Sequence, residues 1–323
     1  HKHAAKSYYP IWETREVYRK LYSELQRGVS DPARDRKLLI NHGLPSLAAG
    51  SFIDFQNWGE MMNLLFLRPP LAGEGAYRYV PDYLGEWQDG KYFAKIGTNL
   101  GIGVWFLPQV TKHLDGLALP EGPEGKATLA RGTRQMLAFN LLYDNPVSDD
   151  RLAPSLRFMN QHYYPEGQGP ASALDDGDPE TPSPSYLHRV SEAMAGLGPF
   201  DGTMRYYPPW LLEQAGQPVQ WTHPVGYPAA AAVQIKVAAY RSGNNLLLVV
   251  GNLNRDQNWE GGMVTVHARG AGSLRLGAGC LAISDPLDGT SPSLADNGDY
   301  VTVKNLIVPA GDFQMVLLSP QGS

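Results

Sequence analysis

The chain has 323 residues, 43% of them hydrophobic and 18% charged, so it can bury a core and does not have the composition of a disordered protein. Its formal net charge is −5 without a basic run, which argues against a nucleic-acid-binding protein that depends on clustered Lys and Arg. Cys280 is the single cysteine, which excludes an intrachain disulfide and a thiolate zinc site, and no stretch reaches the roughly 20 apolar residues of a membrane span.

The first half of the chain alternates between helical patterns and short apolar runs. Apolar residues recur at helical spacing after Thr14, which can cap a helix, and Gly28 can end it. The runs "KLLIN", "SFIDF" and "GIGVWFL" predict short buried strands, since Gly, Pro and Ser bound them. We therefore expect helices at 14–27, 77–95 and 126–142, and strands at 37–41, 51–55 and 101–107.

Apolar strands without polar alternation, separated by helices, are typical of a parallel sheet covered on both faces. Such a sheet most often closes into a (β/α) barrel, which has eight strand–helix units. Only three or four units can be counted in residues 1–200. We expect a (β/α)-barrel-type region there, and the small number of units leaves open that it is only the C-terminal half of a barrel.

The second half changes character after a segment at 165–185 that is rich in Pro, Gly, Ser and acidic residues and is expected to be a linker. A short helix at 187–195 is expected to follow. From about Ala231 onward, short runs rich in β-branched residues are separated by turn residues such as Ser242-Gly243-Asn244. Six or seven strands at this spacing predict an antiparallel β-sandwich, assigned to residues 201–323.

Candidate catalytic residues follow from the position of polar side chains at strand ends. In a parallel barrel the chemistry lies at the carboxyl ends of the strands, where Asn41 and His42 end the first expected strand. A glycosidase needs a carboxylic acid for the leaving oxygen and a second group that attacks or activates water. Glu60 and Asp54 would supply these groups, with His42 and Asn41 binding the substrate by hydrogen bonds and Trp58 by stacking. The alternative for Asp54 is a helix cap or a partner for an arginine.

Two further residues are candidates for substrate binding. Trp105 lies at the end of the third expected strand, where core packing is the alternative role. Tyr163 lies in "NQHYYPEG", an aromatic and acidic loop that could close over a saccharide. The run "LDDGDPE" has the composition of a calcium loop but not its ligand spacing, so we expect neither a metal site nor a cofactor.

The chain resembles large bacterial glycoside-hydrolase-like proteins related to glycoside hydrolase family 123. In these, a helix with an Arg-Glu pair precedes a strand that ends in His and then a Ser-Phe-x-Asp…Gly-Glu segment. The terminal run "VPAGDFQMVLL" resembles the last strand of their C-terminal β-sandwich, and "LGIGVWFLPQV" their next barrel strand. The matching positions are Arg15, Glu16, Lys20, Tyr22, His42, Ser51, Phe52, Asp54, Gly59 and Glu60.

The resemblance implies a barrel followed by a β-sandwich, acting on glycosidic bonds of a carbohydrate substrate in a secreted, periplasmic or cell-surface protein. The adjacent Asp-Glu pair of family 123 does not occur in this sequence, so that catalytic pair is not carried over. The resemblance also implies a missing N-terminal segment or a second chain that completes the barrel. A non-catalytic carbohydrate-binding or envelope protein on the same scaffold remains the alternative function.

Overall fold

The structure, a computed structural model, describes part of the chain. It covers residues 9–31, 37, 39–42, 52–58, 103–106, 138, 141–143, 190, 193–194, 197, 204–254, 257–277, 281–287 and 292–321. The expected helix at 77–95, the expected linker at 165–185 and Cys280 lie outside these residues. In the expected helix at 126–142, the described residues 138, 141 and 142 are helical, and in the expected helix at 187–195 the described residues 190, 193 and 194 are helical.

The first element is helix α1 (Tyr9–Gln26), which begins before the expected start at residue 14. The buried face of α1 is narrower than the spacing of its apolar residues predicts, because Val17 and Leu21 are exposed. The residues that pack against the buried pair Leu39 and Ile53 are Tyr18, Tyr22 and Leu25. The amphipathic pattern thus identified the helix correctly and overestimated the width of its buried face.

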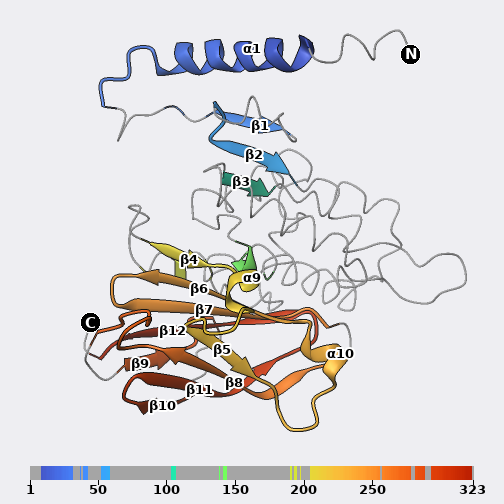
Figure 1. The fold of residues 1–323 in the computed structure, drawn as a ribbon, viewed down its shortest axis with the longest axis vertical. Coiled ribbons are helices and arrows are strands. Elements are labelled where there is room, and N and C mark those ends of the chain that lie inside the picture. The colour runs from blue at the N-terminus through green and yellow to red at the C-terminus, as the bar shows by residue number, and fades with distance from the viewer. Residues whose placement is uncertain are drawn as a thin grey trace, which may run out of the picture.

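Three short strands form a parallel sheet in the order β1 (Ile40–His42), β2 (Phe55–Trp58) and β3 (Gly103–Phe106). The expected parallel pairing is present in these strands (Figure 1). The expected strand at 51–55 is wrong in its bounds, because residues 52–54 form a turn and bend and the strand begins only at Phe55. Three strands do not close a barrel, so barrel closure stays a prediction.

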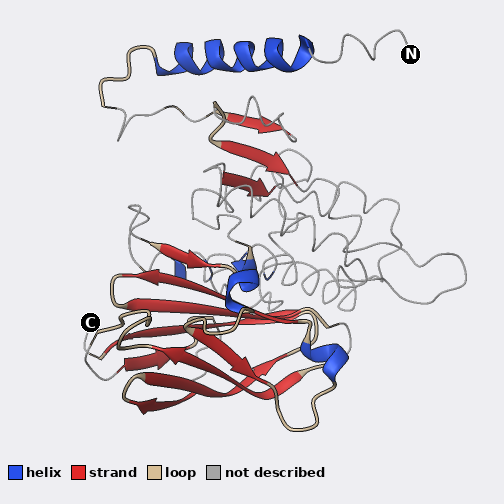
Figure 2. Ribbon diagram, in the orientation of Figure 1, coloured by secondary structure: helices blue, strands red, loops and turns tan. Residues whose placement is uncertain are grey.

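The C-terminal region is a β-sandwich of two antiparallel sheets, as expected (Figure 2). A five-stranded sheet has the order β4-β6-β7-β12-β9 and a four-stranded sheet the order β10-β11-β8-β5. Two short helices, α9 (Pro209–Leu212) and α10 (Ala229–Ala232), lie in the connections. The strands are β4 (Arg205–Tyr207), β5 (Val219–Thr222), β6 (Ile235–Ser242), β7 (Asn245–Asn252), β8 (Trp259–His267), β9 (Leu281–Ser284), β10 (Ser293–Asn297), β11 (Tyr300–Val308) and β12 (Asp312–Pro320).

The two sheets differ in how many of their faces are covered. Strand β8 alternates between buried Val264 and Val266 and partly exposed Thr265, as expected for a sheet with one face open to solvent. Strand β7 is buried at every position after Asn245. Its inner residues belong to the core between the sheets. The fully buried residues on the opposite, outer face of the five-stranded sheet are Ala238, Tyr240, Leu247, Val249, Phe313 and Met315.

The outer face of the five-stranded sheet receives the end of a helix whose described residues are Ala138, Leu141 and Leu142. The hydroxyl of Tyr240 donates to the carbonyl of Leu141, and the hydroxyl of Tyr206 donates to the carbonyl of Leu142 at 2.6 Å. The last carbonyls of a helix have no partner within the helix, so two tyrosines of paired strands cap this end. We call this contact the tyrosine cap.

Aromatic and aliphatic packing surround the tyrosine cap. The ring of Tyr143 stacks on Trp210, with centroids 6.1 Å apart and planes 10° apart. Burial, and then the nearby Glu213 carboxylate, raise the pKa of the Tyr143 hydroxyl well above its ordinary range. The side chain of Leu142 lies over Gly251 of β7, where a Cβ would come within 2.6 Å of its Cδ1. The helix end is therefore fitted to the sheet by shape as well as by hydrogen bonds.

On the inner side, Trp259 anchors the start of β8. Its side chain is fully buried and belongs to the core between the two sheets. It lies against Gly262, where a Cβ would come within 2.2 Å of the ring atom Cζ2. A side chain at position 262 and the indole ring cannot occupy the same space. Among the described helices, none is both long and apolar enough to span a membrane.

Replacing Tyr240 by Phe should lower the free energy of unfolding by about 1–3 kcal/mol, because the buried carbonyl of Leu141 loses its donor. The matched variant Tyr206→Phe removes the same kind of bond from a partly buried site and should cost less. Urea unfolding followed by circular dichroism measures both. Equal stability of Tyr240→Phe and the wild type would contradict the capping role.

Replacing Gly262 by Ala should destabilise the chain by about 1–3 kcal/mol through overpacking against the rigid indole ring of Trp259. The comparison variant Gly251→Ala also creates a close contact, but with the end of the flexible Leu142 side chain, so its cost should be smaller. Thermal unfolding of the two variants gives the order. A larger loss in Gly251→Ala would show that Leu142 is held more rigidly than Trp259.

Candidate functional site

The carboxyl edge of the parallel sheet brings several predicted site residues together at the level of the backbone. His42 of β1 pairs in register with Asn57 of β2, which in turn pairs with Trp105 of β3. Asn41 precedes this row by one position, and Trp58 follows it by one. The strands are parallel, so these positions lie at one edge of the sheet, as the sequence predicted for His42 and Trp105. We call His42, Asn57 and Trp105 the strand-end row.

Asp54 lies at the other end of β2. It precedes the first residue of the strand, Phe55, whose partner Ile40 begins β1. Its Oδ2 accepts the backbone N–H of Leu39 at 2.8 Å, and its own N–H donates to the Leu39 carbonyl at 2.9 Å. The expected position of Asp54 beside His42 is therefore wrong, because the strand starts after Asp54 rather than ending at it. The carboxylate extends the pairing of β1 and β2 by one step.

Glu60 and Tyr163 lie outside the described residues, and their predicted roles stay predictions. Of the predicted site residues, the structure thus brings Asn41, His42, Trp58 and Trp105 to one edge and separates Asp54 from them. In the described part of the chain, no three His, Cys, Asp or Glu side chains gather in a way that could hold a metal ion.

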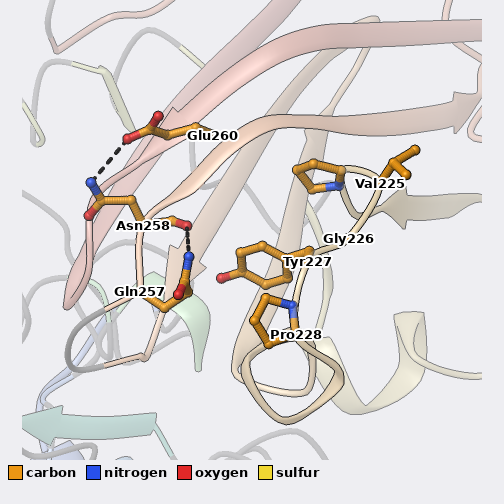
Figure 3. Close-up of a pocket in the computed structure, with 8 residues that line it drawn as sticks. Val225, Gly226, Tyr227, Pro228, Gln257, Asn258 and Glu260 are labelled. Carbon is orange, nitrogen blue, oxygen red and sulfur yellow. Dashed lines mark hydrogen bonds between the residues drawn. The ribbon is translucent and has the colours of Figure 1, made fainter.

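A second candidate site lies on the β-sandwich, where sequence analysis had singled out no residue. It is a hollow of about 390 Å³ between the loop after β5 and the start of β8 (Figure 3). We call it the Tyr227 hollow. Its lining residues are Pro224, Val225, Gly226, Tyr227, Pro228, Gln257, Asn258 and Glu260. The signal in the sequence is the run "HPVGYP", a proline-bounded turn that carries an aromatic ring between two strands.

The two sides of the hollow differ in chemistry. One side is the turn in which the N–H of Tyr227 donates to the Pro224 carbonyl at 3.0 Å. The other side carries two amides and a carboxylate, and the Asn258 Nδ2 donates to Glu260 Oε1 at 3.0 Å. Figure 3 shows the hydroxyl end of Tyr227 directed toward Gln257 and Asn258. The hollow thus combines one aromatic ring with planar polar groups.

The side chain of Tyr227 contacts His223 and Asn254 on the side away from the hollow. The imidazole of His223 stacks on the Tyr227 ring with centroids 5.5 Å apart and planes 8° apart. The buried Asn254 side chain donates through its two Nδ2 hydrogens to Asn252 Oδ1 at 2.8 Å and to the Ala231 carbonyl at 3.0 Å, and the Tyr227 hydroxyl shares these donors at 3.2 Å. The ring position is therefore set by two residues that do not line the hollow.

His223 links the hollow to the core. The indole Nε1 of Trp259 donates to His223 Nδ1 at 3.1 Å. An indole N–H can only donate, so Nδ1 must be unprotonated and the imidazole must be neutral with its proton on Nε2. Burial lowers the pKa of His223 below its ordinary value of 6.5. Both the hydrogen bond and the burial favour the neutral form.

No protein-family model matches the sequence, and the search of curated proteins found no match. Among solved structures, the chain is similar to α-L-fucosidase isoenzyme 2 from Paenibacillus thiaminolyticus, with 10% identity and a TM-score of 0.22, covering 35% of this chain and 16% of that one. It is similar to CldA, a cyclomaltodextrin glucanotransferase with a three-domain ABC distribution, with 12% identity and a TM-score of 0.31, covering 95% and 54%.

A third similar structure is the glycoside hydrolase family 30 subfamily 8 xylanase Xyn30A from Clostridium acetobutylicum, with 12% identity and a TM-score of 0.20, covering 87% of this chain and 95% of that one. The chain spans about half or less of the first two structures, with 16% and 54% of their lengths covered. All three carry the names of carbohydrate-active enzymes. These TM-scores do not establish a shared fold, so a function must rest on the residues of this chain.

Stability should fall as the pH drops below 6.5, because the folded state disfavours the protonated form of His223 and the unfolded state does not. The contribution of His223 is complete above pH 6.5 and is lost as the pH falls through its lowered pKa in the folded state. The variant His223→Gln keeps an acceptor for the Trp259 N–H without titrating. Urea midpoints between about pH 5 and 8 should therefore depend less on pH in this variant, and an unchanged slope would contradict the assignment.

Proposed function

We propose that the chain forms part of a glycoside hydrolase that acts on a complex glycan or polysaccharide, with the sugar at the carboxyl edge of β1, β2 and β3. The observation that carries the proposal is the strand-end row, in which an imidazole, an amide and an indole occur at aligned positions of three parallel strands. The carboxyl ends of parallel strands are where α/β enzymes bind substrates. Indole rings and amide groups are suited to the faces and hydroxyls of sugars.

Glu60 is the proposed general acid, because it follows Trp58, the last residue of β2, by two positions in the sequence. The Asp54 carboxylate bonds to Leu39 at the opposite end of β2, and this favours a structural role for it. A second catalytic carboxylate would then come from another segment. Action outside the cytoplasm, in the periplasm or at the cell surface, is part of the same proposal.

The variant Glu60→Gln should lose most hydrolytic activity, with kcat reduced about 10²–10⁴-fold, because it removes the proton donor while keeping the shape of the side chain. His42→Ala should chiefly raise KM, since His42 is proposed to bind the substrate. Release of reducing sugar from a panel of polysaccharides and aryl glycosides measures both. Glu24→Gln is the matched control, since Glu24 is an exposed carboxylate on α1 paired with Arg27.

Full activity of Glu60→Gln would overturn the assignment of the acid. The alternative is a non-catalytic carbohydrate-binding or envelope protein on the same scaffold. It would be favoured if the wild type binds a saccharide but hydrolyses no substrate of the panel. Circular dichroism and thermal unfolding of each variant separate a lost catalytic group from a lost fold.

A further inference from the structure

We infer that the Tyr227 hollow is a binding subsite for an uncharged saccharide, carried by the β-sandwich and separate from the strand-end row. The ligand class rests on the proposed function, whereas the location rests on the hollow itself. Its volume of about 390 Å³ lies within the roughly 300–1,000 Å³ of small-molecule sites and is enough for part of a glycan chain. The hollow is open to solvent, so a longer chain could run past it.

The hollow offers hydrogen-bond donors and hydrogen-bond acceptors that lie close to one another. Asn258 uses its Oδ1 to accept the Ala310 N–H at 3.0 Å and one amide hydrogen for Glu260, which leaves its second amide hydrogen for a ligand. Within the part of the chain that the structure describes, Glu260 Oε2 has no hydrogen-bond partner, so it can accept from a hydroxyl. The Gln257 side chain bonds only weakly, through Nε2 to the Asn258 carbonyl at 3.4 Å.

Tyr227 supplies the remaining features of a sugar site. Its hydroxyl oxygen accepts from Asn254, so its own hydrogen can be donated into the hollow, toward the side of Gln257. Its ring gives an apolar surface of the kind that packs on the C–H groups of a sugar. Alternating donors and acceptors beside an aromatic ring match the adjacent hydroxyls of a sugar, each of which both donates and accepts.

The charge of the described lining residues disfavours anionic ligands. None of its described lining residues is cationic, and Glu260 adds a negative charge. Among the described lining residues, a phosphate, a sulfate or a uronic acid would meet repulsion from Glu260 without a compensating Lys or Arg. A metal ion has no support either, because the described residues contain no cluster of ligands here. An uncharged polyol is the ligand that these groups fit.

The site is held rigid before any ligand binds. Asn258 is fixed by Ala310, and the Tyr227 ring is fixed by His223 and Asn254. The two residues that fix Tyr227 are themselves bonded to buried residues, since His223 accepts from Trp259 and Asn254 donates to Asn252. Groups that are already in place lose little conformational entropy on binding, which favours affinity from a small number of contacts.

The test is isothermal titration of the full chain with neutral xylo-, malto- and chito-oligosaccharides, in the Glu60→Gln background so that hydrolysis does not interfere. We expect at least one of them to bind, with affinity at least tenfold lower in Glu260→Ala and in Tyr227→Ala. Tyr300→Ala is the matched control, since Tyr300 is a half-exposed tyrosine of the same sandwich that lies outside the hollow. Oligogalacturonate should bind more weakly than the neutral oligosaccharides.

Gln257→Ala and Tyr227→Phe keep the inference testable if Tyr227→Ala is unstable, and each should also weaken binding. Absence of binding by the whole panel, binding unaffected by all of these variants, or a preference for oligogalacturonate or for a quaternary ammonium compound would each overturn it. Failure of the proposed function has a different signature. In that case the wild type hydrolyses nothing, while binding at the hollow is retained and is lost in Glu260→Ala.

Discussion

The buried end of the helix that contains Leu141 and Leu142 imposes a constraint on how this helix packs on the sandwich. Its last carbonyls cannot be left without donors in a place that water does not reach. Tyr206 and Tyr240 supply those donors from neighbouring strands of the sandwich, at positions that are paired across the sheet. Because both hydroxyls come from one sheet, satisfying the helix end also fixes where it lies. The packing of Leu142 on Gly251 follows from that position.

In the sandwich, the long interior strands β6, β7, β8, β11 and β12 lie in the apolar runs of the sequence, because many of their residues are buried. The strands that were missed, β4, β5 and β10, all lie at sheet edges. Two of them are short, and β10 has the polar sequence "SLADN". A short or polar edge strand is held by its neighbour's backbone rather than by its own apolar residues, so a hydrophobic pattern is a poor guide to it. The edge strands β1 and β3 were predicted because they lie in apolar runs.

The candidate sites differ in whether a local sequence pattern could predict them. The rule that polar groups follow the carboxyl ends of parallel strands identified the edge with His42 and Trp105, because it depends only on strand order. It placed Asp54 wrongly, since "SFIDF" does not show which of its residues enters the strand. The Tyr227 hollow was beyond prediction, because the pairing of β5 with β8 brings together residues 224–228 and 257–260. No local pattern contains that pairing.

The burial of the five-stranded sheet on both faces has a consequence for how such a chain can evolve. A sandwich with one open face can be moved between proteins as an independent module, because nothing is exposed when its neighbour is lost. Here Leu247, Val249 and Met315 would come into contact with water if the partner surface were removed. Recombination at the junction near residue 200 would therefore yield a poorly soluble product. The sandwich and the segment that contains residues 138–143 are expected to be inherited as a pair.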